Sequence, residues 1–395
     1  MSLTPTLIRW LQSEKGRRWL APLSAAPQND AELLPTLTRL RRELSPAQAA
    51  AVVETARLRQ RAARKFPAAA ARMFFTRTSL QQASAADVAT HTAKRFIPFR
   101  QVLDLGCGLG GDSLALACAG VQTIAVDHDP LALALVAANA RTLDYPRRIA
   151  VLRADVRHPA WRAPAAWADP GRRTDGRRLF DPEQLRPPLS ALLAQRWSYA
   201  GNLGVKLMPG LAHDAIPPDA EAEWISLNGE LKEAVLWFGE LLREPVRRAT
   251  ILPAGVDLIA TDARADVRTP GRYLYEPDPA VIRAGAVADL ALSLGLWQID
   301  PTIAYLAADD LIPTPFARSW RVLEHHPFEL KALNRRLRAL QGRVVAVKKR
   351  GSPVDPEAFR RRLYRHPRGR PLIVVLTRVA GKPWMLICDA VVDGE

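Results

Sequence analysis

The chain has 395 residues, enough for two to four domains with separate cores, and it is 48% hydrophobic and 24% charged. No apolar run approaches the roughly 20 residues that cross a bilayer, and the N-terminus lacks a signal peptide's apolar core, which excludes a helical membrane protein. Three cysteines without a CxxC pair or disulfide framework predict a soluble cytoplasmic protein, and a net charge of +16 suits a polyanionic partner.

Residues 1–90 are expected to be helical. The stretch LTRLRRELSPAQAAAVVETARLRQRAARKF has apolar residues at helical spacing, with Ser45 as N-cap and Pro46 at the first helical position. From about Arg100, helical segments alternate with short β-branched runs, namely QVLDLG, VQTIAVD, RIAVLRAD, AAWAD, LGVKLM, EWISLN and ATILPAG. This alternation predicts a parallel α/β sheet with helices on both faces, ending near Gly255.

The rest of the chain is expected to form two smaller mixed segments. The first has a strand, a Pro-rich turn and a helix that begins near Pro279; the second has the order helix, strand, helix and hairpin (LKALNRRLRALQ, RVVAVKK, DPEAFRRRLYR, PLIVVLTRV-AGK-PWMLICDAVV). The last 75 residues hold 17 Lys and Arg against 7 Asp and Glu, so they carry +10 of the net charge. We therefore expect four domains, at residues 1–90, 91–255, 256–320 and 321–395.

A glycine-rich loop follows the first predicted strand, in the sequence VLDLGCGLGGDS. Gly106, Gly108 and Gly111 fit the G-x-G-x-x-G pattern of a nucleotide-binding loop between a strand and a helix. Asp104 lies at the end of the strand and Asp112 at the start of the helix. Carboxylates there would repel a pyrophosphate but attract the sulfonium and ammonium of S-adenosylmethionine, so this cofactor is favoured over a dinucleotide.

Further acids end the next two predicted strands. Asp127 in TIAVDHDP can accept both ribose hydroxyls, and Asp155 in LRADV lies near the expected place of the adenine amine. Single acids of this kind often only cap a helix or close a turn, but successive strand ends form the edge where α/β sheets bind ligands. Their neighbours complete the predicted cofactor site: Cys107, His128 and Val156.

These motifs, in this order, resemble the class I S-adenosylmethionine-dependent methyltransferases. FFTRTSLQQAS, YLYEPDPAVIRAG and VAVKKRG…VDPEAFRRRL…LTRV extend the resemblance over nearly the full length, to the bacterial methyltransferases with a C-terminal THUMP-like domain. The resemblance implies an α/β fold: a Rossmann-like core, an N-terminal helical domain, a ferredoxin-like third segment and a THUMP-like end. THUMP modules in related enzymes bind structured RNA.

WADPGRR ends the fourth predicted strand. Similar amino-group methyltransferases have an acid or Asn here, then two prolines and an aromatic; the acid accepts from the target amine and the aromatic stacks on the base. Asp169 and Pro170 match that pattern, whereas Gly171 and Arg172 depart from it. We expect Asp169, Pro170 and Arg172 to be catalytic, and Arg172 or Arg173 to stack on a base or bind phosphate.

Other basic residues complete the expected substrate site. Lys206 ends the fifth strand and should face the same crevice, while Lys348, Lys349 and Arg350 leave a strand of the basic domain and should bind RNA phosphates. The seven histidines show no metal-ligand spacing, so no metal is predicted. The oligomeric state and the identity of the RNA, tRNA or rRNA, are not predicted.

Three functions remain open at this level. An RNA N-methyltransferase that acts on an exocyclic amine, with guanine N2 preferred, agrees with the acid at the fourth strand and with the basic end. A methyltransferase with a protein or small-molecule acceptor would show no salt-dependent RNA binding. The third is a non-catalytic protein that binds RNA and S-adenosylmethionine and whose core has lost turnover. Asp104, Asp127 and Asp169 argue against it, whereas Gly171 and Arg172 keep it open.

Overall fold

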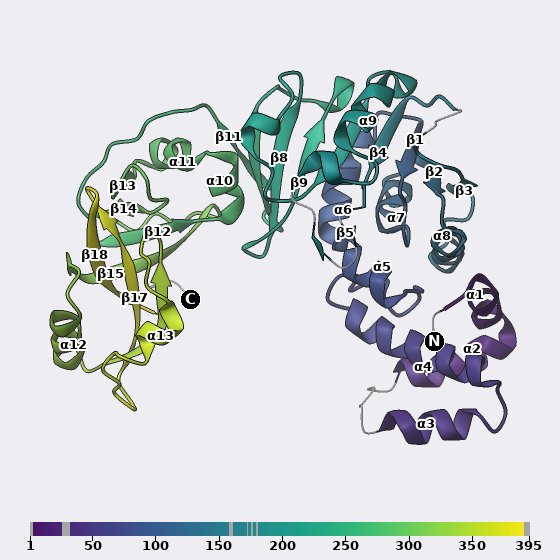
Figure 1. The fold of residues 1–395 in the computed structure, drawn as a ribbon, viewed down its shortest axis with the longest axis horizontal. Helices are drawn as coiled ribbons and strands as arrows, with labels where there is room; N and C mark the ends of the chain where they lie inside the picture. The colour runs from purple at the N-terminus through teal and green to yellow at the C-terminus, as the bar shows by residue number, and fades with distance from the viewer. Residues whose placement is uncertain are drawn as a thin grey trace. The chain divides into compact units, whose positions relative to one another are not determined.

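The computed structural model describes residues 3–25, 32–157, 161–171 and 181–390, with the backbone alone of 173–174 and 177–178. The chain divides into two compact units, which are described separately (Figure 1). The core unit is Met1–Ala222 with Lys232–Pro245, and the C-terminal unit is Glu223–Leu231 with Val246–Glu395. In the described ranges, no helix is long and apolar enough to cross a membrane. The four-domain division stays a prediction.

The first part of the core unit is helical, as expected. Its helices are α1 (Pro5–Gln12), α2 (Glu14–Ala25), α3 (Leu33–Leu40), α4 (Pro46–Ala62), α5 (Arg77–Gln82) and α6 (Ala86–Ala93). The predicted start of α4 is confirmed: Ser45 Oγ accepts from the backbone N–H of Gln48, and the Gln48 side chain accepts from Ser45 N–H. One hydrophobic core joins α4 to α7 (Gly111–Cys118) and α8 (Pro130–Thr142), for example through Val52 and Val136.

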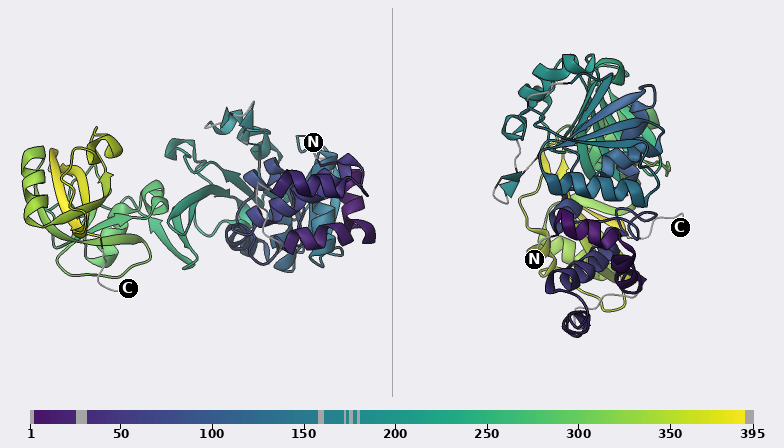
Figure 2. Two further views of the ribbon diagram at one scale, coloured as in Figure 1. Left: turned by 90° about the horizontal axis from the view of Figure 1, so that it is seen from below. Right: turned by 90° about the vertical axis from the view of Figure 1, so that its right-hand side faces the viewer.

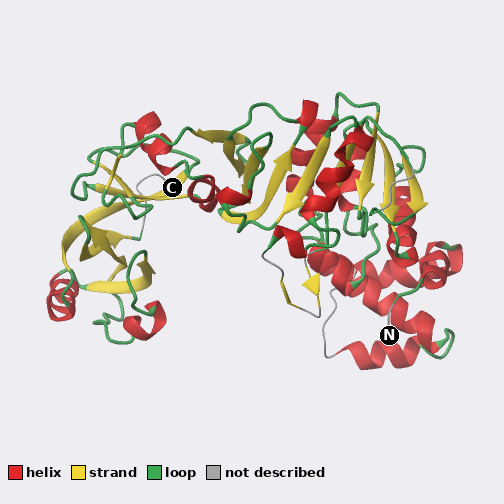
Figure 3. Ribbon diagram, turned by 45° about the horizontal axis from the view of Figure 1, so that its top comes forward, coloured by secondary structure: helices red, strands yellow, loops and turns green. Residues whose placement is uncertain are grey.

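Six strands of the core unit lie in the order β3-β2-β1-β4-β7-β9. They are β1 (Gln101–Leu105), β2 (Gln122–Asp127), β3 (Ile149–Arg153), β4 (Ala165–Ala168), β7 (Leu203–Leu207) and β9 (Glu230–Trp237). The first five pair in parallel, and the strand order reverses between β1 and β4, which is where open α/β sheets bind ligands. Figure 3 shows these strands flanked by helices.

The sheet is not parallel throughout, which corrects the expectation from sequence. β9 runs antiparallel to β7, and the complete sheet has nine strands in the order β11-β10-β8-β9-β7-β4-β1-β2-β3. β8 (Glu221–Leu227) and β9 are joined by Asn228 and Gly229, whose φ angles of 54° and 75° fit a two-residue hairpin turn. The sheet also continues past Gly255, the predicted end, into β11 (Val256–Ala260).

The C-terminal unit holds β10 (Arg247–Leu252), β11 and a second sheet in the order β13-β14-β12-β15-β18-β17-β16 (Figure 2). The strands of the second sheet are β12 (Tyr273–Pro277), β13 (Trp297–Gln298), β14 (Leu306–Ala308), β15 (Ala317–Pro327), β16 (Gly342–Lys349), β17 (Arg370–Val379) and β18 (Lys382–Asp389). Its helices are α10 (Pro279–Ala284), α11 (Val287–Leu294), α12 (Leu330–Ala339) and α13 (Pro356–Arg360).

Local sequence signals place several of these elements. Asp278 caps α10 at the predicted start, because its side chain accepts from Ala280 N–H. The predicted hairpin forms between β17 and β18. α12 and α13 pack against the sheet through Leu337 and Phe359. α13 ends at Arg360, so it is shorter than the sequence suggested. The ferredoxin-like description of the third segment stays a prediction.

Candidate active site

The glycine loop after β1 requires glycine at its first position. Gly106 has a φ of +82°, in the left-handed region that other residues rarely adopt. A Cβ at Gly106 would also lie 3.0 Å from the backbone oxygen of Asp169, which follows β4. The loop after β1 and the end of β4 therefore lie against each other, so a ligand on the loop would be next to Asp169.

Asp104 lies beneath this loop as a buried acid that is only partly compensated. The Ser113 hydroxyl in α7 donates to its Oδ2, while its Oδ1 accepts no hydrogen bond from any described residue. Burial, together with the nearby Asp112 carboxylate, raises the pKa of Asp104 to about 8, against the lowering effect of Ser113. Asp104 is therefore mainly protonated near neutral pH, and a cationic ligand group close to the loop would favour its ionised form.

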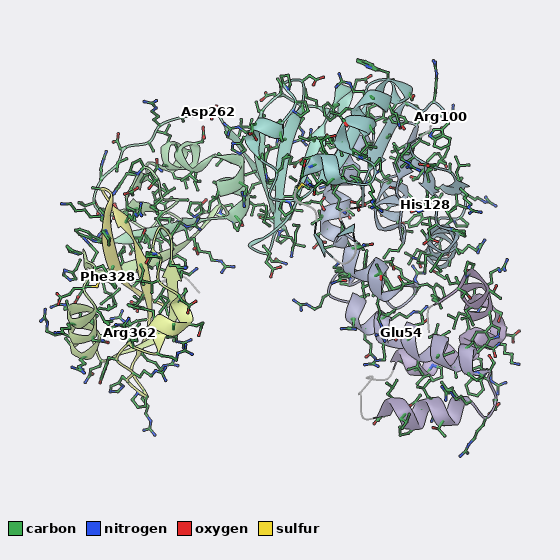
Figure 4. The ribbon with its side chains drawn as sticks, in the orientation of Figure 1. Glu54, Arg100, His128, Asp262, Phe328 and Arg362 are labelled. Carbon is green, nitrogen blue, oxygen red and sulfur yellow. The ribbon has the colours of Figure 1, made fainter. Side chains whose placement is uncertain are left out.

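Asp127 ends β2 with its carboxylate fixed by two backbone groups. Gly108 N–H donates to Oδ2 at 3.2 Å and Asp129 N–H donates to Oδ1 at 3.0 Å. The side chain remains 12% exposed, so its outward lone pairs can accept from a ligand diol. His128 lies beside it with an 88% exposed side chain, at the surface of the core unit (Figure 4).

The Asp155 carboxylate, in contrast, forms an ion pair with nearby Arg157. The Arg157 guanidinium donates to both of its carboxylate oxygens, from Nε at 3.0 and 3.1 Å and from Nη2 at 2.6 Å, and Arg157 N–H adds a fourth contact. Val156 between them is half-buried. A contact of Asp155 with adenine would require this local pair to open, so its predicted role stays a prediction.

The other residues predicted around the glycine loop have different exposures. Cys107 is buried, and burial with the nearby Asp104 raises the pKa of its thiol well above the usual value, so its side chain is no nucleophile. Its backbone N–H donates to Val126 O at 3.2 Å, which holds the loop on β2. Asp112 is half-buried in the first turn of α7, where a carboxylate interacts favourably with the helix dipole.

Asp169 occupies the end of β4, as predicted, and its charge is balanced from the neighbouring strand. Lys206 Nζ on β7 lies 2.7 Å from Asp169 Oδ2. The Lys206 side chain is 2% exposed and that of Asp169 is 23% exposed, so the lysine lies beneath the acid and faces the protein interior. Pro170 is buried, whereas Arg172 lies outside the described residues. Arg173 is described only by its backbone, in the two-residue pair β5 (Arg173–Thr174) with β6 (Arg177–Arg178).

Two residues that sequence reasoning missed complete this cluster. Glu233 on β9 has its Oε2 3.9 Å from Lys206 Nζ, and Ser84 Oγ donates to the same Oε2 at 3.0 Å. Recognition of the Asn228-Gly229 turn would have predicted β9 as the partner of β8 and placed Glu233 in a strand. No local signal links Ser84 to this site, although it lies in the FFTRTSLQQAS motif.

The basic residues of the C-terminal unit divide into paired and exposed side chains. Lys348 and Arg350 both contact the Glu276 carboxylate of β12, and Lys348 also lies over the Trp320 ring at 4.6 Å. Lys349 between them is exposed. The structure does not place this group relative to the core unit. Within the described residues, no cluster of His, Cys, Asp and Glu could hold a metal ion.

The strand order, the glycine loop at the switch point and the acids at the strand ends together define a Rossmann-like methyltransferase core. The glycine loop and the partly exposed carboxylate of Asp127 suit a ligand with a ribose diol, as S-adenosylmethionine has.

Comparison with known proteins assigns the family. Two uncharacterized S-adenosylmethionine-dependent methyltransferases, from Mycobacterium tuberculosis strains CDC 1551 and H37Rv, are each 38% identical over 340 residues, which cover 83% of this chain and 92% of theirs. Residues 317–390 match the THUMP domain-like family, 99–180 the RNA cap guanine-N2 methyltransferase family, and 4–62 a domain of unknown function. The chain belongs to the S-adenosylmethionine-dependent methyltransferases with a C-terminal THUMP-like domain.

A solved structure agrees with the fold along the whole chain. The crystal structure of a proposed methyltransferase from Porphyromonas gingivalis W83 covers 97% of both chains with a TM-score of 0.73 and 21% identity. The expected enzyme class and cofactor are confirmed by the two relatives of 38% identity.

Proposed function

We propose that this enzyme methylates an exocyclic amine of an RNA base, with guanine N2 as the preferred atom. The observation that carries the proposal is Asp169 at the end of β4, next to the glycine loop and with its charge balanced by Lys206. The match of residues 99–180 to a guanine-N2 methyltransferase family and the THUMP-like match at 317–390 support an RNA acceptor.

Asp169 has the geometry of an acceptor for an amine. Lys206 occupies Oδ2, whereas Oδ1 accepts no hydrogen bond from a described residue. Oδ1 can therefore accept an N–H of the target amine, and this contact would turn the nitrogen lone pair toward the glycine loop. S-adenosylmethionine supplies an electrophilic methyl group there. No strong base is required of the protein, because Asp169 needs only to orient the neutral amine. After the methyl group is transferred, the nitrogen carries a positive charge and readily loses its proton to Asp169 or to water.

The segment after Asp169 differs from the usual acceptor loop. Gly171 stands where a second proline is common, and it pairs with Arg186 through two backbone hydrogen bonds of 2.9 and 3.1 Å. This pairing fixes the start of the loop that continues to Arg172 and Arg173. We propose that a guanidinium plane from one of these arginines stacks on the base in place of the aromatic ring.

RNA affinity is assigned to the exposed basic residues of the C-terminal unit. Lys349, Arg361 and Arg362 are exposed, and Figure 4 labels Arg362 in this unit. Lys348 and Arg350 are already paired with Glu276, so we expect them to stabilise the local fold more than to bind phosphate. Contacts of this kind recognise the shape of RNA rather than its sequence.

Asp169→Ala tests the catalytic assignment. The variant should bind S-adenosylmethionine within a few-fold of the wild type but transfer methyl groups about 100-fold more slowly to RNA from a strain that lacks the enzyme, because the orienting acceptor is lost. Asp214→Ala, which removes an exposed aspartate elsewhere in the core unit, is the matched control and should be fully active. Normal turnover by Asp169→Ala would show that Asp169 only closes a turn.

A further inference from the structure

A chain of polar contacts links the helical region to Asp169 within the core unit. Ser84 Oγ donates to Glu233 Oε2 at 3.0 Å, Glu233 Oε2 lies 3.9 Å from Lys206 Nζ, and Lys206 Nζ lies 2.7 Å from Asp169 Oδ2. The side chains of Lys206 and Glu233 are 2% and 4% exposed, so water does not screen their charges effectively.

The first member of this chain is held in place by a lysine. Lys65 Nζ donates hydrogen bonds to the backbone carbonyls of Leu80, Gln81 and Ala83, at 2.8, 3.2 and 2.7 Å. These carbonyls end α5, where a cation satisfies the helix terminus and its dipole. In addition, Ala86 N–H donates to Lys65 O at 2.8 Å. Lys65 therefore forms hydrogen bonds to the backbone both before and after Ser84, which holds that residue in place.

We propose that Glu233 is a positioning residue for methyl transfer. Held by Ser84, its carboxylate attracts the Lys206 ammonium and thereby sets how strongly Asp169 can accept a hydrogen bond from the target amine. The inference rests on the role proposed above for Asp169, whereas its members Ser84 and Glu233 need not touch a substrate. It also gives the N-terminal helical region a part in catalysis, because that region supplies Ser84 and Lys65.

The charge on Glu233 should control how strongly Asp169 accepts a hydrogen bond. When Glu233 is protonated, it no longer attracts Lys206 as a charged group, so Lys206 interacts more strongly with Asp169 and weakens it as an acceptor. When Glu233 is ionised, the two carboxylates share Lys206, and Asp169 is a better acceptor. Methyl transfer should therefore become faster as Glu233 loses its proton.

The surroundings of Glu233 place this ionisation near neutrality. Burial raises its pKa to about 7, with Asp112 from α7 and Asp169 from the end of β4 acting in the same direction. Lys206 from β7 and the Ser84 hydrogen bond act in the opposite direction. Lys65 lies close enough to Lys206 and Lys232 for both ammonium groups to lower its pKa.

The test is the pH dependence of methyl transfer by the full-length enzyme. Labelled S-adenosylmethionine is incubated with an extract of a strain that lacks the enzyme, and label is counted separately in RNA, protein and small molecules. In the fraction that takes label, the maximal rate of the wild type should rise through a midpoint near 7. Glu233→Gln keeps the size of the side chain and should abolish this rise, with a rate at pH 8.5 lower by about tenfold and an unchanged KM for the cofactor.

Two further variants separate positioning from stability. Ser84→Ala removes a hydrogen bond that favours the ionised Glu233, so its midpoint should move to higher pH. Ser79→Ala disrupts the capping box at the start of α5, the helix that precedes Ser84, and should lower only the melting temperature.

The outcomes distinguish this inference from the proposed RNA acceptor. Label in the protein fraction would refute the RNA acceptor, yet the pH profiles could still be compared there. A wild-type profile in Glu233→Gln, or an unmoved midpoint in Ser84→Ala, would overturn the positioning role. If Glu233→Gln does not fold, Ser84→Ala alone decides the question.

Discussion

Replacement of Asp127 by alanine should weaken cofactor binding by a predictable amount. The Asp127 carboxylate has about four acceptor positions, of which backbone N–H groups of Gly108 and Asp129 use two. His128 Nδ1 lies 3.4 Å from Oδ1, and the side chain is 12% exposed, so we expect the remaining positions to accept the ribose hydroxyls. Loss of these charge-assisted hydrogen bonds, corrected for the water that replaces them, should cost about 2–3 kcal/mol, which is roughly a 30- to 150-fold weaker Kd.

Calorimetry with two ligands tests the reasoning behind this value. S-adenosylmethionine and S-adenosylhomocysteine share the ribose and differ in the sulfonium charge, so Asp127→Ala should weaken both equally. Asp129→Ala is the matched control: its side chain caps α8 through Leu131 N–H, so the variant should lose stability but not affinity. An unchanged affinity, or a loss confined to S-adenosylmethionine, would refute the assignment of Asp127 to the ribose.

Three further predictions follow from single contacts. Gly106→Ala should lower the free energy of unfolding by about 1–3 kcal/mol in a denaturant titration, since its φ is +82° and its Cβ would meet Asp169 O at 3.0 Å; wild-type stability would contradict the strain. Asp104 has a pKa in the folded protein of about 8, raised from 3.8, so the folded state binds more protons between pH 4 and 8 and stability should fall as pH rises, by up to about 1.4 kcal/mol for each pH unit. Urea unfolding should show a smaller loss of stability between pH 5.5 and pH 8 in Asp104→Asn than in the wild type. An equal loss in both proteins would mean that other groups cause the pH dependence. Lys349→Glu should reduce the slope of log affinity against log salt for RNA by about one unit, measured by filter binding, and an unchanged slope would exclude a phosphate contact at Lys349.

Local sequence signals predicted much of the fold and of the cofactor site. Ser45 and Pro46 start a helix because they satisfy and pre-organise its first turn, and this signal needs no tertiary context. Asp127 and Asp169 follow apolar strands, and parallel strands bring their carboxyl ends to one edge, so their proximity to the glycine loop could be inferred.

The contacts of buried charges could not be read in this way. Glu233 and Ser84 are 149 residues apart, and Glu233 lies in ELKEAVLW, where charged and apolar residues mix without a clear period. Likewise, the sequence gives no sign that Lys348 pairs with Glu276, 72 residues away. Such pairs depend on long-range packing, and a single sequence gives no information on which distant acid meets a given base.

In the proposed reaction, the methyl acceptor is a base amine of RNA. The most direct measurement is to incubate the enzyme with labelled S-adenosylmethionine and total RNA from a strain that lacks it, digest the RNA, and identify the labelled nucleoside. We predict label in N2-methylguanosine, absent from the Asp169→Ala reaction. Label on a carbon, a ribose oxygen or only on protein would contradict the claim.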